Sequence, residues 1–113
     1  MDLSIATSGT PARPVTVLSV HGDIDLDSAP ALRAALHELF DRPQPRIVVE
    51  LSGVGFCDSS GLGAFVYGYT HCRDHGGFLH LAAPTPFLTG ILAVVGIAGH
   101  VPIFDTVADA VPG

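Results

Sequence analysis

Residues 57–63 read CDSSGLG, a polar and glycine-rich break between two strongly apolar segments. Before the break, Arg46 to Leu51 (RIVVEL) has the composition of a buried strand. After it, apolar residues recur at the i, i+3, i+4 and i+7 spacing of a helix with one apolar face: Leu62, Phe65, Val66 and Tyr69. The break is therefore predicted to join the end of a strand to the N-terminus of a helix.

Such a position suits a negative charge. The first backbone N–H groups of a helix lack partners within the helix, and the helix dipole is positive there. An oxyanion at Ser59 or Ser60 would therefore be tolerated, either as a bound anion or as a phosphate on the serine itself. Asp58 is most simply the residue that caps the helix, and a Ser-Ser pair at a helix start is more often plain capping than a regulatory site.

The residues before the break predict a hairpin and a helix. Weak alternation at 3–7 and clearer alternation at 15–20 indicate two strands, separated by a Gly-Thr-Pro turn. Asp27-Ser28-Ala29-Pro30 is a helix start, with a capping side chain and a proline inside the first turn. An apolar stripe follows and ends at Pro43 and Pro45.

The residues after the break predict further alternation of strands and helices. A buried strand is expected at 78–82, and a helix from Pro86 to Gly96 with Val95 on its apolar side. A last strand at 101–104 contains Pro102, which places it at a sheet edge. A short helix at 106–110 follows. The order β-β-α-β-α-β-α-β, with a possible final α, predicts an α/β fold with a mostly parallel sheet.

Composition limits the classes of function. The 113 residues are 48% hydrophobic and 14% charged, which predicts one folded domain over residues 1–113 with a core at about 3–107. A net charge of −6 disfavours nucleic acid and anionic membranes as partners. No secretory signal or membrane span is visible, so a cytoplasmic location is expected. Cys57 and Cys72 are expected to be buried, reduced thiols, and neither a metal nor a cofactor is expected.

Three segments of the chain resemble a known family. They are Gly22-Asp23-Ile24-Asp25, the VVELSGV run at 48–54, and the DSSGLG run at 58–63. Together they resemble STAS domains and, among these, the bacterial anti-sigma factor antagonists. The resemblance extends over most of the chain and implies a sheet with an antiparallel opening strand and helices packed mainly on one face.

The resemblance also implies a function, which is partner switching. The serine directly after the aspartate, here Ser59, would be phosphorylated by an anti-sigma factor that is also a serine kinase. The unphosphorylated protein would bind that factor and free a sigma factor, and a PP2C-type phosphatase would reset it. The implied partner-binding residues are Asp23, Asp25, Asp58, Ser59, Ser60, Gly61 and Leu62. The chain would act as a monomer or weak dimer.

Other interpretations stay open. Related STAS proteins serve as accessory subunits of lipid-transport ABC systems or as interaction modules that are never phosphorylated. Asp23 and Asp25 also fit a solvated turn in which Asp25 or Asp27 caps the next helix. His71 and His75 have the i, i+4 spacing of a metal pair, but a solvated helix face is the simpler interpretation. The Gly-x-Ser-x-Gly pattern of hydrolases is absent around Ser59, so the chain is not expected to be an enzyme.

Overall fold

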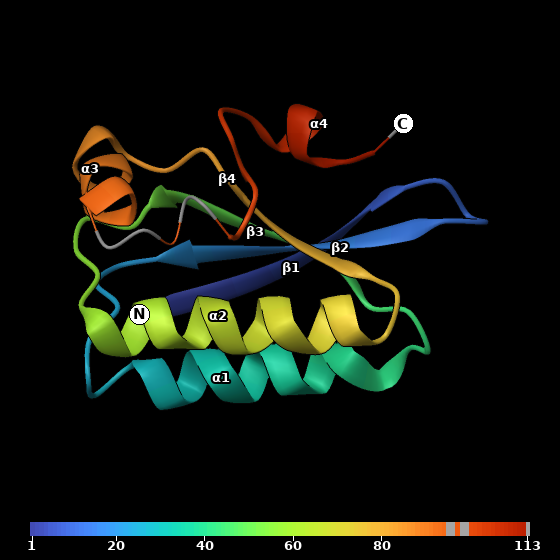
Figure 1. Cartoon of the computed structure of the whole chain (residues 1–113), viewed down its shortest axis with the longest axis horizontal. Helices are drawn as coiled ribbons and strands as arrows, with labels where there is room; N and C mark the ends of the chain where they lie inside the picture. The colour runs from blue at the N-terminus through green and yellow to red at the C-terminus, as the bar shows by residue number, and fades with distance from the viewer. Residues whose placement is uncertain (95–96, 98–99, 113) are drawn as a thin grey trace.

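The computed structural model describes residues 1–94, 97 and 100–112. Its strands and helices follow one another in the predicted order (Figure 1). The strands are β1 (Asp2–Gly9), β2 (Pro14–His21), β3 (Arg46–Gly53), β4 (Phe78–Ala82) and β5 (Ile103–Phe104). The helices are α1 (Ala29–Glu38), α2 (Ser59–Asp74), α3 (Pro86–Val94) and α4 (Val107–Ala110), with a short 3-10 turn at Leu39–Asp41 after α1.

The strands form one sheet in the order β1-β2-β3-β4-β5. β1 and β2 pair antiparallel as a hairpin, and every later neighbour pairs parallel. The predicted α/β class, with its antiparallel opening strand, is confirmed. β5 lies at the edge and is shorter than expected because the strand begins only after Pro102, whose nitrogen has no hydrogen to donate. The carbonyl of Pro102 still accepts the N–H of Leu81, at 2.9 Å.

Two hydrophobic clusters lie on the two sides of the sheet. The larger one joins alternate residues of β2, β3 and β4, such as Leu18, Val49 and Leu81, to buried residues of α1, α2 and α3. The smaller one joins the opposite side, including Val17 and Val48, to α4. Figure 1 shows α1 and α2 side by side along one side of the sheet and α4 on the other. The prediction of helices mainly on one face is therefore confirmed.

α3 begins where the sequence predicted. Thr85 precedes Pro86, and its Oγ1 accepts the N–H of Leu88 at 3.2 Å, which caps the helix. The helix is described as far as Val94. The predicted contribution of Val95 and the predicted end at Gly96 lie outside the described residues.

The apolar face predicted for α2 is confirmed in part, because Phe65 lies in the core and Leu62 and Tyr69 pack against it. The most buried face of the helix is, however, rotated away from Val66. Of the four residues expected to be buried, only Phe65 is fully buried, whereas Val66 is 45% exposed. Leu62 and Tyr69 are half-buried. The buried residues of the helix are Gly61, Ala64, Phe65, Gly68 and Cys72.

Two glycines explain this rotation of the helix. A Cβ added to Gly61 would lie 2.6 Å from Cγ2 of Ile24, and one added to Gly68 would lie 2.7 Å from Cδ1 of Leu79. Because both positions lack a side chain, α2 can approach its neighbours closely along this face. Val66 is then left exposed, while Leu62 and Tyr69 pack half-buried against the edge of the core.

Cys57 and Cys72 are free and buried, as predicted. Burial raises the pKa of each thiol to about 12, and the Asp58 carboxylate adds to the effect at Cys57. The thiolate is the reactive form, so the folded protein should resist iodoacetamide at pH 8 and take up two alkyl groups only after unfolding in urea. Mass spectrometry before and after unfolding checks this. Rapid alkylation of the folded protein would contradict the burial of these thiols.

Candidate functional site

Asp58 caps α2. Its Oδ1 accepts the backbone N–H of Ser60 at 2.8 Å and that of Gly61 at 3.3 Å. Its own carbonyl accepts the N–H of Leu62 at 3.1 Å, which closes the first helical turn. The predicted capping role is confirmed, and the carboxylate fixes the loop that leads into the helix.

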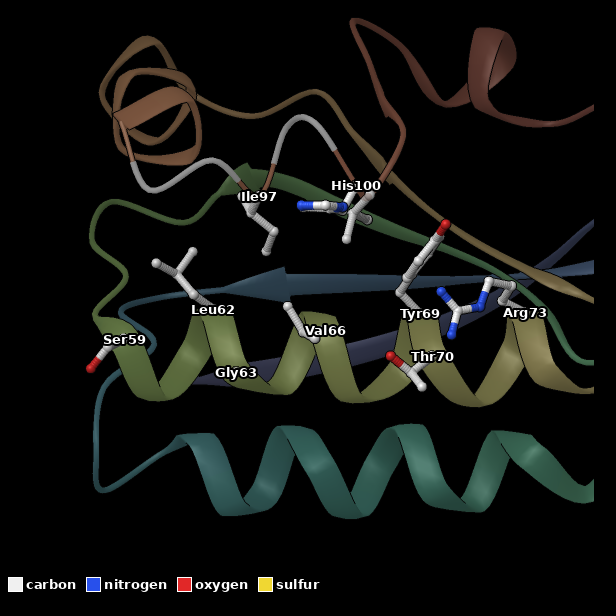
Figure 2. A pocket seen from close by; sticks show the side chains of 10 residues that line it. Ser59, Leu62, Gly63, Val66, Tyr69, Thr70, Arg73, Ile97 and His100 are labelled. Atoms are coloured by element: carbon white, nitrogen blue, oxygen red, sulfur yellow. The ribbon is translucent and has the colours of Figure 1, made fainter.

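Ser59 is the first residue of α2, and its side chain is exposed. Figure 2 shows its hydroxyl oxygen pointing outward at the end of the helix. Ser60 is half-buried in the same turn, and Gly61 is buried against Ile24 and Cys57. Of the two hydroxyls, that of Ser59 is therefore the more accessible to another protein.

A β-bridge between two loops places the Gly-Asp-Ile-Asp segment at 22–25 beside the loop that carries Ser59. Ile24 pairs with Cys57 in a parallel β-bridge. The N–H of Ile24 donates to the carbonyl of Phe56 at 2.9 Å, and the N–H of Asp58 donates to the carbonyl of Ile24 at 3.0 Å. Asp23 and Asp25 flank Ile24, so this loop lies directly beside the one that carries Ser59.

Asp25, rather than Asp27, organises the start of α1. Its Oδ1 accepts the backbone N–H groups of Asp27 at 3.1 Å and Ser28 at 3.0 Å, and its carbonyl accepts that of Ala29. Hydrogen bonds from the backbone and side chain of Ser28 lower the pKa of Asp25. Ser28 holds the capping position without a capping bond from its side chain, which corrects the prediction for this helix start. Its hydroxyl bonds back to the carbonyl of Asp23 at 3.1 Å.

Exposed apolar side chains border the site. Leu26, which is 74% exposed, follows Asp25, and Phe56, which is 43% exposed, precedes Cys57. Sequence reasoning did not single out either residue. A signal was present, because each is a large apolar residue inside a short polar loop beside a predicted site. Exposed apolar groups grouped in this way are typical of a surface that binds another molecule.

The histidine pair of α2 stacks with an aromatic ring. The rings of Phe40 and His71 are 3.8 Å apart, and those of His71 and His75 are 4.1 Å apart. Burial lowers the pKa of His71, and the neighbouring His75 and His37 lower it further. Within residues 1–94, 97 and 100–112, no three His, Cys, Asp or Glu side chains gather as metal ligands. None of the helices in that part of the chain is long and apolar enough to cross a membrane.

Comparison with known proteins defines the class. The family model described as "Mlab, STAS domain" matches residues 9–105. The chain therefore belongs to the STAS domain family.

Within that family, the chain is similar to anti-sigma factor antagonists. It is 28% identical over 99 residues to the anti-sigma F factor antagonist of Paenibacillus polymyxa, covering 87% of this chain and 85% of the relative. It is also 28% identical to an anti-sigma factor antagonist of known structure from Mycobacterium paratuberculosis, with a TM-score of 0.80 over 96% of this chain and 91% of that one.

The antagonist SpoIIAA has the same fold and has been solved in two states. The unphosphorylated form is 16% identical to this chain, with a TM-score of 0.67 over 94% of this chain and 92% of that one. The phosphorylated form, from Bacillus, is 19% identical, with a TM-score of 0.67 over 95% and 96%. This chain is therefore as similar in fold to one state as to the other.

The capping role of Asp58 gives a testable effect on stability. Asp58→Ala removes the acceptor for two N–H groups and should lower the free energy of unfolding by about 1 kcal/mol. Asp58→Asn keeps an acceptor oxygen at the same place and should cost much less. Urea unfolding followed by circular dichroism measures both variants. Equal losses for alanine and asparagine would show that the carboxylate acts in some way other than capping.

Proposed function

We propose that this chain is an anti-sigma factor antagonist that works by partner switching in the cytoplasm. Its unphosphorylated form binds an anti-sigma factor with serine kinase activity and releases a sigma factor. Phosphorylation of Ser59 ends that binding, and a PP2C-type phosphatase restores it. The observation that carries the proposal is the exposed hydroxyl of Ser59 at the start of α2, held by the Asp58 cap.

A phosphate on Ser59 is compatible with the fold. It would add about −1.5 to −2 charges at neutral pH, at the helix end where the dipole stabilises negative charge. Ser59 is exposed, so the phosphate would displace no buried side chain. The equal similarity of this chain to both forms of SpoIIAA supports a switch without a change of fold.

The phosphate would therefore change the affinity for the partner rather than the fold. Leu26 and Phe56 supply exposed apolar contacts on the two loops beside Ser59, and half-buried Leu62 supplies another one turn along the helix. A partner packed over these side chains would also cover the Ser59 hydroxyl. Phosphorylation would bring bulk and charge into that contact, and removing the charge from water costs free energy unless the partner pairs it.

The other predicted partner-binding residues divide into two groups. The Asp23 carboxylate faces the neighbouring loop, since a Cβ on Gly55 would lie 3.5 Å from its Oδ1. We assign direct contact to Asp23, Ser59 and Leu62. Asp25, Asp58 and Gly61 affect binding indirectly, by holding the two loops in place. Asp25 and Asp58 accept backbone hydrogen bonds, and Gly61 is buried. Ser60 lies at the margin of the contact.

The first test is phosphorylation of the purified chain. Incubation with ATP and each candidate anti-sigma factor kinase of the same organism should add one phosphate, seen by intact-mass measurement. Ser59→Ala should abolish the gain in mass, whereas Ser60→Ala should keep it. Equal labelling of the Ser59→Ala variant would refute Ser59 as the site. No labelling by any candidate kinase would favour the alternatives of a lipid-transport accessory subunit or an interaction module that is never phosphorylated.

A further inference from the structure

A groove runs along the exposed face of α2, starting beside Ser59. Its volume is about 580 Å³, within the range of about 300–1,000 Å³ that small-molecule sites occupy. Leu62 and Val66 line one side, and Ile97 and Val101 line the other. Figure 2 shows the side chains of Leu62 and Tyr69 projecting from α2 toward the side on which Ile97 and His100 lie. This is the face of α2 that the sequence predicted to be buried.

The ends of the groove differ in chemistry. Ser59 lies at one end and Arg73 near the other, while Leu62 and Val66 line the helix between them. Besides the phenol of Tyr69, the ionisable side chains among the described residues of its lining are Arg73 and His100, both nitrogen bases. No carboxylate belongs to this described lining, although acidic residues outnumber Lys and Arg by eleven to five in the chain. The groove therefore combines an apolar body with a cationic end.

Arg73 is available to a ligand. Its guanidinium lies 5.5 Å from the centre of the Tyr69 ring and 3.2 Å from Oδ1 of Asp74. The side chains of this ion pair are 58% and 56% exposed, and ion pairs this exposed contribute little to stability because water screens them. A carboxylate whose apolar chain is held in the groove can therefore compete with Asp74 for the guanidinium. Arginine is also suited to bidentate contact with a carboxylate.

We propose that this groove binds a small amphipathic carboxylate, of the class of a medium-chain fatty acid. The carboxylate pairs with Arg73, and the alkyl chain lies along Val66 and Leu62 against Ile97 and Val101. From Leu62 to Arg73 the helix rises by about 16 Å at about 1.5 Å per residue, which gives room for an extended chain of this class. The proposal concerns binding in the groove and does not depend on phosphorylation of Ser59.

Titration of the isotope-labelled full chain with decanoate, below its micelle concentration, tests this by NMR. We expect saturable shifts of the backbone amides of Leu62, Val66 and Arg73. Arg73→Gln should weaken binding about tenfold or more, and decanol, which lacks the charge, should bind the unmodified chain comparably weakly. Arg42→Gln removes the same charge from a residue that lines a separate surface pocket and not the groove, and it should leave the affinity unchanged.

Three results would overturn the proposal. Shifts that are absent or never saturate would show that the groove is not a fatty-acid site. Equal losses for Arg73→Gln and Arg42→Gln would show a response to net charge rather than to the groove. Equal binding of decanol and decanoate would remove the role of the carboxylate and leave an apolar surface, as expected if a segment of a protein partner fills the groove instead.

Discussion

Ser59→Asp is expected to lower the affinity for the anti-sigma factor by roughly 10- to 100-fold, which corresponds to about 1.4–2.8 kcal/mol. The added carboxylate places one unpaired negative charge in the contact proposed above, and the partner must remove it from water. Ser59→Ala adds neither bulk nor charge and should stay in the binding form. Isothermal titration calorimetry with the purified anti-sigma factor measures both affinities.

A control separates the contact from a general effect of charge. Ser60→Asp adds the same charge one residue later, where the side chain is half-buried and lies at the margin of the proposed contact. Its affinity should fall less than that of Ser59→Asp. A carboxylate at the first helical position should leave the fold as stable as before or slightly more stable, because it favours the dipole. Thermal melting checks this, and a Ser59→Asp variant that binds with unchanged affinity would contradict the proposed switch.

The sequence was sufficient for the order of elements because each one carries a local signal. The buried strand at 46–51 contains the apolar run Ile47 to Val49 followed by Leu51, and the helix after it starts at an aspartate that accepts two backbone N–H groups. The turn before Pro14 and the breaks at Pro43 and Pro45 follow from residues that restrict the backbone. Such signals involve only residues that are close together in the chain, so they can be recognised without knowledge of the tertiary structure.

The surroundings of Ser59 depend on contacts between distant residues. The bridge from Ile24 to Cys57 joins two loops more than thirty positions apart, and no local sequence pattern indicates it. The family resemblance was what placed Asp23 and Asp25 near the serine, and the structure supplies the hydrogen bonds that hold them there. The choice of Asp25 over Asp27 at the start of α1 likewise depended on backbone geometry.

The orientation of α2 could not be predicted from hydrophobicity, because its closest contacts are made by glycines. A periodicity analysis gives weight to Leu62, Val66 and Tyr69 and little to Gly61 and Gly68. Close packing instead favours Gly61 and Gly68 on the buried face, since a missing side chain lets the helix approach Ile24 and Leu79. The same rotation exposes the groove described above, so the unexpected exposure of Val66 and the candidate ligand site have one cause.

Phe65 and Val66 are adjacent on α2 and give the sharpest test of that rotation. Phe65→Ala deletes a fully buried ring and should lower the free energy of unfolding by about 3–5 kcal/mol, a large part of the roughly 5–15 kcal/mol typical of a domain. Val66→Ala should change it by no more than about 0.5 kcal/mol, because the side chain is 45% exposed and alanine favours a helix. Urea unfolding of the two variants and the unmodified chain measures both differences. If the two substitutions destabilised the fold by similar amounts of 1 kcal/mol or more, Val66 would have to be buried beside Phe65, and α2 would then present the face that hydrophobic periodicity alone predicts.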